Sequence, residues 1–244
     1  MAGALPEYFQ RLEQGKRFCF SCHPGVPCFT ECCRELDLVL TPYDVLRLKN
    51  KVRMNSSDFL EQYVIIEQGP DLAFPLCYLT MVDDGRASCV FVAPGGCTVY
   101  EDRPAACRAY PVGRGASREN NGCVRETLVL VREPHCLGFT GNVNQTAGEY
   151  FRNQSLDDYN RRNDEIMILL QHDRIRRGFR PTRRQQDQFI LALYNQDLFR
   201  QEMSNGRINM KRPLAIEELQ GLAGDDEQLL RLGGRWLRQE LFNE

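Results

Sequence analysis

The sequence lacks any long apolar run, and nothing in it approaches the roughly 18 residues of a membrane-spanning helix. It also lacks an excess of either charge, because 31 basic and 33 acidic residues leave a formal net charge of -2. This balance argues against a strongly basic nucleic-acid-binding protein and against an acidic tail. No internal repeat or low-complexity segment occurs. At 244 residues, the chain can form one substantial core with a smaller helical extension.

The N-terminal stretch MAGALPEYFQRLEQGKRF has no long apolar run behind a basic end. We therefore predict no signal peptide and no membrane association, and we expect a cytoplasmic protein. Disulfides are disfavoured in that reducing compartment, so clustered thiols there indicate metal ligands or redox groups.

Cysteine is the residue in excess, with eleven copies, and its distribution divides the chain. All eleven lie between Cys19 and Cys136, and none follows. This change of composition predicts a cysteine-rich metal-binding domain over residues 1–140 and a helical region over residues 141–244. The turn-like GFTGNVNQT marks the boundary.

Local patterns predict an α+β fold for the cysteine-rich part, with short antiparallel strands and helices. A helix is expected over 41–52, where Thr41 can cap, Pro42 suits the first turn and Asp44 favours the positive end. Further expected elements are a short helix at 56–65, strands at 74–82 and 126–133, and a strand–turn–strand at 87–100 with Pro94, Gly95 and Gly96 in the turn.

The C-terminal region shows helical spacing of its apolar residues and is expected to bind a protein partner. One helix is predicted around Leu156–Leu170, a second through Phe189, Leu193 and Phe199, and a third over 225–242, interrupted by two glycines. Between them, Arg174–Arg184 is arginine-rich. Because Phe179 is its only aromatic residue and the net charge is negative, a solvated interhelical segment is favoured over a nucleic-acid site.

The densest cysteine group is at the N-terminus. Cys28 and Cys32 have the local spacing at which one loop can offer two thiolates to one metal site. Cys32 and Cys33 are adjacent, and we expect their side chains to diverge, so they face two sites or one of them packs as a small apolar residue. Cys19 and Cys22 form a C-x-x-C, which is common to zinc knuckles, iron–sulfur loops and redox dithiols. Their role is left open.

The other cysteines are more dispersed. Cys89 and Cys97 flank the APGG turn, which can bring their thiols to one site. Cys107 lies between two arginines, Arg103 and Arg108. These can neutralise an anionic metal site or, alternatively, pair at the surface with neighbouring acidic residues.

Three cysteines lack an obvious partner in the sequence. Cys123 and Cys136 each lie near a turn-forming glycine, and His135 is adjacent to Cys136. His135 is interpreted as a polar surface residue. Cys77 lies inside an apolar strand and is interpreted as a core residue.

Three segments, CFTECCRELDLVLTPYDVLRL, CVFVAPGGCTVYEDRPAACRAYP and HCLGF, resemble the YkgJ-type cysteine-cluster family, a zinc- or iron-chelating domain. They span roughly residues 28–138, which leaves Cys19, Cys22 and most C-terminal helices outside the match. Many members have C-x-x-CC, whereas here three residues separate Cys28 from Cys32. The resemblance implies a metal-binding domain with the following ligands: Cys28, Cys32, Cys33, Cys89, Cys97, Cys107, Cys123 and Cys136.

All-sulfur ligation suits both zinc and iron–sulfur clusters. The long, uneven cysteine spacings favour a cluster, which is wider than one ion, so we predict an iron–sulfur cluster of the [4Fe–4S] type, with zinc as the alternative. The predicted function is electron transfer or support of a partner enzyme. A zinc- or iron-chelating structural module is the first alternative. The second is a methyltransferase-related enzyme, because a similar domain occurs in bacterial flagellin lysine methylases. No clear glycine-rich loop for S-adenosylmethionine is present, and no catalytic residue is assigned.

Overall fold

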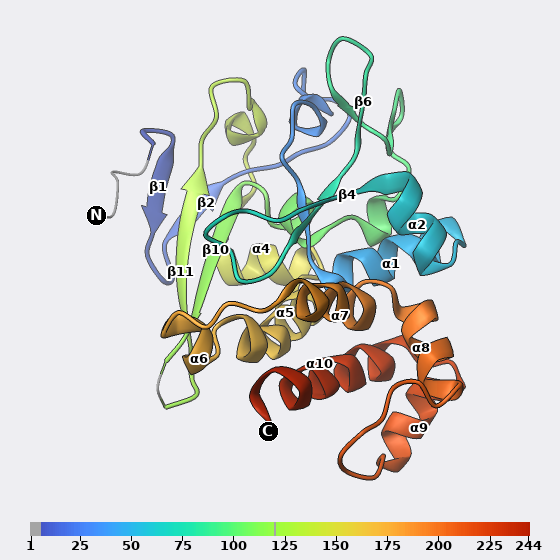
Figure 1. Cartoon of the computed structure of the whole chain (residues 1–244). Coiled ribbons are helices and arrows are strands. Elements are labelled where there is room, and N and C mark those ends of the chain that lie inside the picture. Colours follow the sequence, from blue (N-terminus) through green and yellow to red (C-terminus); the bar gives the residue numbers. More distant parts are fainter. Residues whose placement is uncertain (1–5, 120) are drawn as a thin grey trace. The chain divides into compact units, whose positions relative to one another are not determined.

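A computed structural model describes residues 6–119 and 121–244. Figure 1 shows the order of the elements along the chain. The first five residues of the stretch from which no signal peptide is predicted lie outside the described residues. Within the described ranges, no helix combines the length and the apolar character needed to cross a membrane.

The architecture is α+β, as predicted. The strands are β1 Phe9–Leu12, β2 Arg17–Cys19, β3 Val39–Leu40, β4 Val64–Glu67, β5 Leu76–Leu79, β6 Met81–Val82, β7 Ser88–Cys89, β8 Val92–Ala93, β9 Gly96–Cys97, β10 Val112–Arg118, β11 Val124–Val131 and β12 Asn144–Thr146. The α-helices are α1 Pro42–Val52, α2 Ser56–Tyr63, α3 Ala105–Ala109, α4 Ala147–Asn153, α5 Asp157–Leu170, α6 Asp173–Arg176, α7 Arg183–Leu193, α8 Gln196–Ser204, α9 Ile216–Ala223 and α10 Asp226–Phe242. Short 3₁₀ turns are η1 Glu31–Cys33, η2 Tyr100–Asp102 and η3 Gly138–Thr140.

The chain divides into two compact units, and each is assembled from two separate segments. The first unit joins the N-terminal segment up to Leu38 with Met81–Arg161, and the second joins Val39–Thr80 with Arg162–Glu244. Every cysteine except Cys77 belongs to the first unit. The run predicted as one strand at 74–82 becomes β5 in the second unit and β6 in the first. The boundary near residue 140, which rests on composition, lies within the first unit and stays a prediction.

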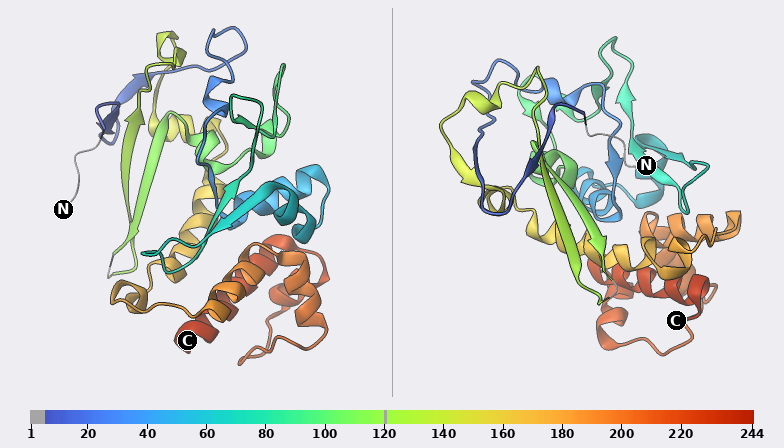
Figure 2. Two further views of the ribbon diagram at one scale, coloured as in Figure 1. Left: turned by 45° about the horizontal axis from the view of Figure 1, so that its top comes forward. Right: turned by 90° about the vertical axis from the view of Figure 1, so that its left-hand side faces the viewer.

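The first unit is built around an antiparallel sheet of order β1-β11-β10 (Figure 2). Small two-stranded pairings, β12-β2, β6-β7 and β8-β9, accompany it. The predicted strand at 126–133 is confirmed as part of β11, and its partner β10 was missed because VGRGASR has no apolar alternation. The expected hairpin at the APGG turn is also confirmed, since Ala93 pairs with Gly96.

The second unit begins with the predicted N-terminal helix. In α1, the Thr41 side chain accepts from the Asp44 backbone N–H at 3.2 Å, and Asp44 accepts from the Thr41 backbone N–H at 2.8 Å. This reciprocal cap, with Pro42 at the first helical position, confirms the motif. The short helix α2 is also confirmed, with Asn55 as its cap. A small antiparallel sheet of order β3-β5-β4 packs in the same unit.

The C-terminal helices differ from prediction in two places. The apolar residues expected in one helix lie in two, because Asn195 leaves the helical conformation between α7 and α8. Asn195 Oδ1 there accepts hydrogen bonds from the hydroxyls of Ser56 and Ser57, at 2.9 and 3.0 Å. The hydrogen bonds between Asn195 and α2 therefore accompany the break between α7 and α8.

The second difference concerns Gly233 and Gly234, which do not interrupt the last helix. α10 runs through both. A Cβ at Gly233 would lie 2.3 Å from the carbonyl oxygen of Ala192 in α7, whereas a Cβ at Gly234 would meet nothing within 4 Å. Gly233 is thus required for close packing of α10 on α7, and Gly234 is not.

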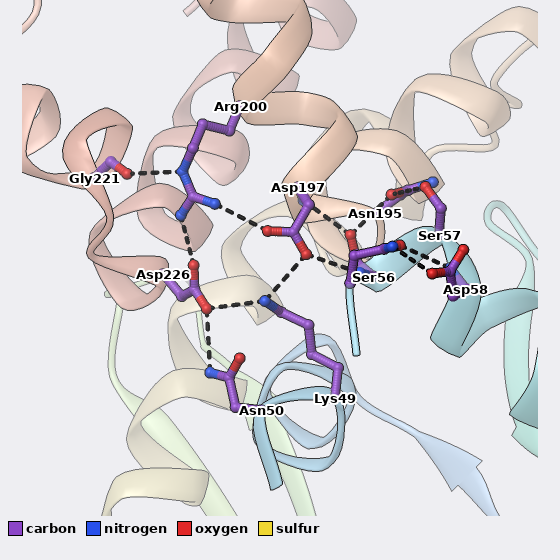
Figure 3. A network of polar contacts seen from close by, with 11 residues as sticks. Lys49, Asn50, Ser56, Ser57, Asp58, Asn195, Asp197, Arg200, Gly221 and Asp226 are labelled. Carbon is purple, nitrogen blue, oxygen red and sulfur yellow. Dashed lines mark hydrogen bonds and ion pairs between the residues drawn. The ribbon is translucent and has the colours of Figure 1, made fainter. Parts of the chain in front are cut away.

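Buried charges connect the helices of the second unit. Lys49 Nζ of α1 lies 3.0 Å from Asp226 Oδ2 and 3.2 Å from Asp197 Oδ2 (Figure 3). Arg200 donates to both aspartates, at 2.5 Å to Asp226 and 3.0 Å to Asp197. Burial alone would raise the pKa of Asp226, but the hydrogen bond from Arg200 and the charge of Lys49 outweigh it and lower the pKa.

Gly233→Ala and Gly234→Ala should change stability in opposite directions. The added methyl at position 233 must push α10 away from α7, which we expect to cost about 1–3 kcal/mol of unfolding free energy. The same methyl at 234 should add about 0.5–1 kcal/mol, because alanine is the better helix former. Urea unfolding followed by the fluorescence of Trp236, the single tryptophan, measures both. Equal effects of the two substitutions would contradict this packing.

The lowered pKa values of Asp197 and Asp226 predict an acid dependence of stability. Burial would raise the pKa of Asp197, but the hydrogen bond from the Ser56 backbone N–H and the charge of Lys49 lower it further than burial raises it. The stabilisation is complete above the ordinary pKa of 3.8 and is lost as pH falls through the lower folded pKa values. Asp226→Asn should lose about 2 kcal/mol at pH 7 and show a flatter decline of stability as the pH falls below about 4. Parallel pH profiles of the variant and the parent, measured by urea unfolding, would be inconsistent with this assignment.

Candidate metal centre

The loop that carries Cys22 is fastened to the turn that follows Cys136. The backbone N–H of Ser21 donates to the Gly138 carbonyl at 2.9 Å, and that of Phe20 donates to the Val143 carbonyl at 3.1 Å. A Cβ at Gly138 would lie 2.5 Å from the Phe20 ring. The absence of a side chain at this position lets two segments more than 100 residues apart approach closely.

A cluster of aromatic rings packs around this contact. The Phe20 ring is 3 % exposed and packs edge-on against Phe139, Tyr150 and Tyr110, at ring-centroid distances of 5.2, 6.0 and 6.3 Å. Such edge-to-face pairs fix ring orientation as well as burying apolar area. The loop entering Cys22 is therefore held by packing and by backbone hydrogen bonds.

Successive turns shape the chain from His23 to Cys33. The Cys28 carbonyl accepts from the Glu31 backbone N–H, and the Thr30 carbonyl accepts from that of Cys33, both at 3.0 Å. The Leu137 backbone N–H donates to Cys28 Sγ at 3.1 Å. An amide donor aimed at sulfur stabilises a thiolate and is typical of the surroundings of sulfur-ligated metals.

The adjacent cysteines do not diverge as expected. A hydrogen bond links the thiols of Cys32 and Cys33, and this contact, followed by burial, raises the pKa of Cys32 far above its usual range. The single-carbon arms of the two side chains let their sulfurs turn toward each other. Cys32 also contributes to the raised pKa values of Cys22 and Cys136 and opposes the effect of Arg103 on Cys97.

The β8-β9 hairpin brings a second segment to these cysteines. Gly96 has a φ of 118° and its Cα lies under the Phe29 ring, which a Cβ there would approach to 3.1 Å. The hairpin turn thus packs on the loop between Cys28 and Cys32. Cys97 of β9 adds to the raised pKa of Cys89 of β7, and the prediction that the two thiols share one site stays a prediction.

Cys136 has a hydroxyl partner. The Tyr110 hydroxyl donates to Glu133 Oε2 at 2.8 Å and also lies in hydrogen-bond contact with Cys136. Burial and these two acidic neighbours raise the pKa of Tyr110, so it remains a donor. The Tyr110 hydroxyl thus lies beside the sulfur of Cys136 with its proton directed to Glu133, while the Leu137 N–H donates to the sulfur of Cys28.

The thiols around Cys22 interact with one another electrostatically. Although the residue as a whole is exposed, the surrounding protein partly desolvates the Cys22 sulfur, and this effect, followed by those of Cys32, Cys28 and Cys136, raises its pKa to about 11, while Arg103 lowers it. Burial is also the largest cause of the raised pKa of Cys136, to which Cys28 and Cys32 add. The raised pKa values keep the thiols of Cys22 and Cys136 neutral at pH 7 without a cation, and a bound metal would favour their thiolate forms.

The arginines around Cys107 are not paired at the surface. Arg103 and Arg108 are 8 % and 4 % exposed. Arg108 donates to the backbone carbonyls of Arg103 and Gln154, at 3.0 and 2.8 Å, and so braces the chain. The charge of Arg103 lowers the pKa of Cys22 and of Cys97. Arg103 is thus the arginine that acts on the thiols.

The remaining cysteines lie in different surroundings. Cys107 is half-buried on α3 between the two arginines. Cys19 is exposed at the end of β2. Cys123 is exposed at the turn between β10 and β11, about 20 Å along that ladder from the end near Cys136, at 3.4 Å per residue. The structure therefore does not bring Cys123 to the other thiols, and its role as a ligand stays a prediction.

Two further residues agree with their interpretations. Cys77 is fully buried in β5, burial raises its pKa to about 12, and it belongs to the core of the second unit. His135 is about half exposed, with its side chain 3.7 Å from Glu133, as expected for a polar surface residue.

The cysteines of the first unit do not converge on a single metal position. Among the described residues, no three cysteine, histidine, aspartate or glutamate side chains converge closely enough to surround a single metal ion. The chemistry of the donors nevertheless fits a sulfur-ligated group: soft ligands from four segments, N–H and O–H donors beside sulfur, and one buried guanidinium.

Comparison with known proteins identifies this part of the chain. Residues 21–136, just under half of the sequence, match the family model CxxCxxCC, described as "Putative zinc- or iron-chelating domain". The segment is therefore a domain of the cysteine-cluster family that the motifs indicated, and metal binding through its cysteines is its function at that level. No curated protein and no solved structure matches the chain.

The family match corrects the extent of the resemblance. It begins at residue 21 and so includes Cys22, which the motifs had left outside. The structure likewise groups Cys22 with Cys28, Cys32 and Cys136. Sequence spacing could not reveal this, because the long loop between Cys22 and Cys28 and the approach of Cys136 depend on tertiary contacts. The sequence offered one signal of this approach, the two glycines Gly138 and Gly141, where a Cβ would overlap Phe20 and Ser21.

Gly138→Ala should loosen the metal centre. The new Cβ would overlap the buried Phe20 ring, and we expect a loss of about 1–3 kcal/mol in unfolding free energy together with reduced metal retention. Gly95→Ala is the matched control, because a Cβ there meets nothing within 4 Å and lies in the same domain. Metal content after chelator challenge is the measurement. Equal retention in the two variants would show that the Phe20 contact does not hold the centre.

Proposed function

We propose that the first unit holds an iron–sulfur cluster of the [4Fe–4S] type and that the protein serves in electron transfer with a partner enzyme. The observation that carries the proposal is the set Cys22, Cys28, Cys32 and Cys136. Cys32, Cys28 and Cys136 each raise the pKa of Cys22, and Cys28 and Cys32 raise that of Cys136, so the four side chains lie within electrostatic range of one another. Four thiols from two distant segments are the ligand number that such a cluster needs.

The spread of these thiols supports a cluster over one zinc ion. Four sulfurs at 2.3 Å from a zinc ion would lie about 3.8 Å from one another. Among the described residues no three potential ligands lie close enough to hold a single ion, although Cys32, Cys28 and Cys136 each affect the pKa of Cys22. A cubane cluster separates its ligands more widely, so its four cysteines need not touch.

The surroundings also suit a cluster that exchanges electrons. When bound, an iron–sulfur cluster accepts and donates single electrons at a potential set by charge, hydrogen bonds to sulfur and solvent exposure. The Leu137 N–H at Cys28 supplies such a hydrogen bond, and the Tyr110 hydroxyl lies in contact with Cys136. Cys22 is exposed and the other three are half-buried, so the centre lies near the surface, where a redox partner can approach.

Metal analysis of protein purified without oxygen tests the proposal. We expect a brown protein with iron and acid-labile sulfide in equal amounts, about four of each per chain. Stoichiometric zinc in a colourless protein would overturn the cluster assignment and leave a chelating structural module. Equimolar iron without sulfide would indicate a mononuclear iron site.

Single cysteine-to-serine variants test the ligand set. C22S, C28S, C32S and C136S should each lose most of the bound iron and the visible absorption, because serine replaces a soft thiolate with a poor ligand. C123S should retain both, since Cys123 is exposed at the far end of the β10-β11 ladder. C19S is a second exposed control. Full retention in C22S would refute the proposed set, and iron loss in C123S would restore the original prediction for that residue.

A further inference from the structure

The arginine-rich segment between α6 and α7 has a fixed backbone. The Phe179 N–H donates to the Arg174 carbonyl at 2.8 Å, and Gly178 adopts a φ of 96° that completes the turn. The Phe179 ring packs against Phe242 at a ring-centroid distance of 6.1 Å, and Pro181 is buried. The segment is therefore anchored inward at its apolar positions and is not a loosely solvated linker.

Its arginines point outward and several have no partner. Within the part of the chain that the structure describes, the side chains of Arg177, Arg180 and Arg184 are exposed and make no hydrogen bond or ion pair. Arg183 lies beside them with an 81 % exposed side chain, and its contact with Asp187 is a surface pair at 3.2 Å. Such an exposed pair contributes little and leaves the guanidinium available.

The placement of these charges is unfavourable for the isolated fold. Thr182 caps α7, so Arg183 and Arg184 occupy its first turn, where the helix already presents a partial positive charge. Cations are disfavoured at this end, and the helix has no acidic residue in its first turn to compensate. Charges that oppose local stability in this way are expected at functional surfaces.

We propose that Arg177, Arg180, Arg183 and Arg184, here named the arginine face, bind an acidic segment of a partner protein. Charge complementarity selects the occupant. Residues 173–187 contain six arginines, two aspartates and no lysine, so in a chain of net charge -2 the rest of the sequence is net acidic. The guanidinium group suits this role because it binds carboxylates in a bidentate geometry.

A short acidic peptide fits the arginine face better than a nucleic acid does. The only aromatic ring of the segment, Phe179, is engaged by Phe242 and by Arg174, whose guanidinium lies 4.8 Å from the ring centre. No ring is thus free to stack on a base, which single-stranded binding requires. A long polyanion would also meet the net acidic remainder of the chain. The inference is independent of which metal the first unit binds.

Fluorescence anisotropy with the full-length, metal-loaded protein tests the proposal. The probes are a labelled peptide of alternating glutamate and glycine and a labelled single-stranded oligonucleotide of equal charge. We expect the peptide to bind, with an affinity that falls as salt increases. The variant R177Q/R180Q/R184Q should bind it about tenfold more weakly. The matched variant R53Q/R207Q/R212Q changes the same net charge at other exposed positions of the second unit and should bind like the parent.

Each other outcome overturns the proposal. Equal weakening by the two triple variants would reveal only a non-specific charge effect, and absence of peptide binding at low salt would remove the site. Tighter binding of the oligonucleotide than of the peptide would assign the arginine face to nucleic acid. Iron content and urea unfolding, measured on every variant, distinguish a lost surface from a misfolded protein or a lost metal centre.

Discussion

The metal centre depends on one backbone contact, the hydrogen bond from the Ser21 N–H to the Gly138 carbonyl. It holds the loop of Cys22 against the turn after Cys136, and the Phe20 ring fills the space that Gly138 leaves. Cys22 directly follows Ser21, and Cys136 and Leu137 directly precede Gly138. The Leu137 N–H donates to Cys28 Sγ. The N-terminal segment supplies Cys22, Cys28 and Cys32 of the proposed ligand set and the other segment supplies Cys136, so their contact brings the four residues together.

A gathering of thiols is poor core material, and this explains why metal binding and folding should be coupled in the first unit. Burial raises the pKa values of Cys89, Cys97 and Cys136, so the thiols are neutral and contribute little attraction to one another. A metal group exchanges their protons for strong bonds, and its binding free energy then becomes folding free energy. Arg103 offsets part of the negative charge that such an exchange produces, which gives this buried cation a reason to lie beside Cys22 and Cys97.

Local chemistry allowed much of the fold to be predicted, and long-range packing accounts for what was missed. Thr41, Pro42 and Asp44 specify the start of α1 through contacts within four residues, so the sequence was sufficient there. Gly233 has the same local signal as a helix breaker, but its role is set by Ala192 on another helix. The same limit applies to the site. The electrostatic effect of Cys97 on Cys89 follows from a short hairpin. The inclusion of Cys22 follows from the approach of distant segments, and the remoteness of Cys123 follows from the length of the β10-β11 ladder.

The two compact units divide the chemistry between them. The first carries ten of the eleven cysteines and the proposed cluster, while the second is stabilised by apolar helix packing and by the ionic network of Lys49, Asp197, Asp226 and Arg200. The arginine face belongs to the second unit, whose core contains no sulfur ligand. The proposed recognition of a partner by surface charge therefore requires no change at the thiols, and the potential of the proposed cluster would be set by its own hydrogen bonds. This separation would let one chain combine a metal centre sensitive to its immediate surroundings with the proposed docking surface, which is sensitive to ionic strength.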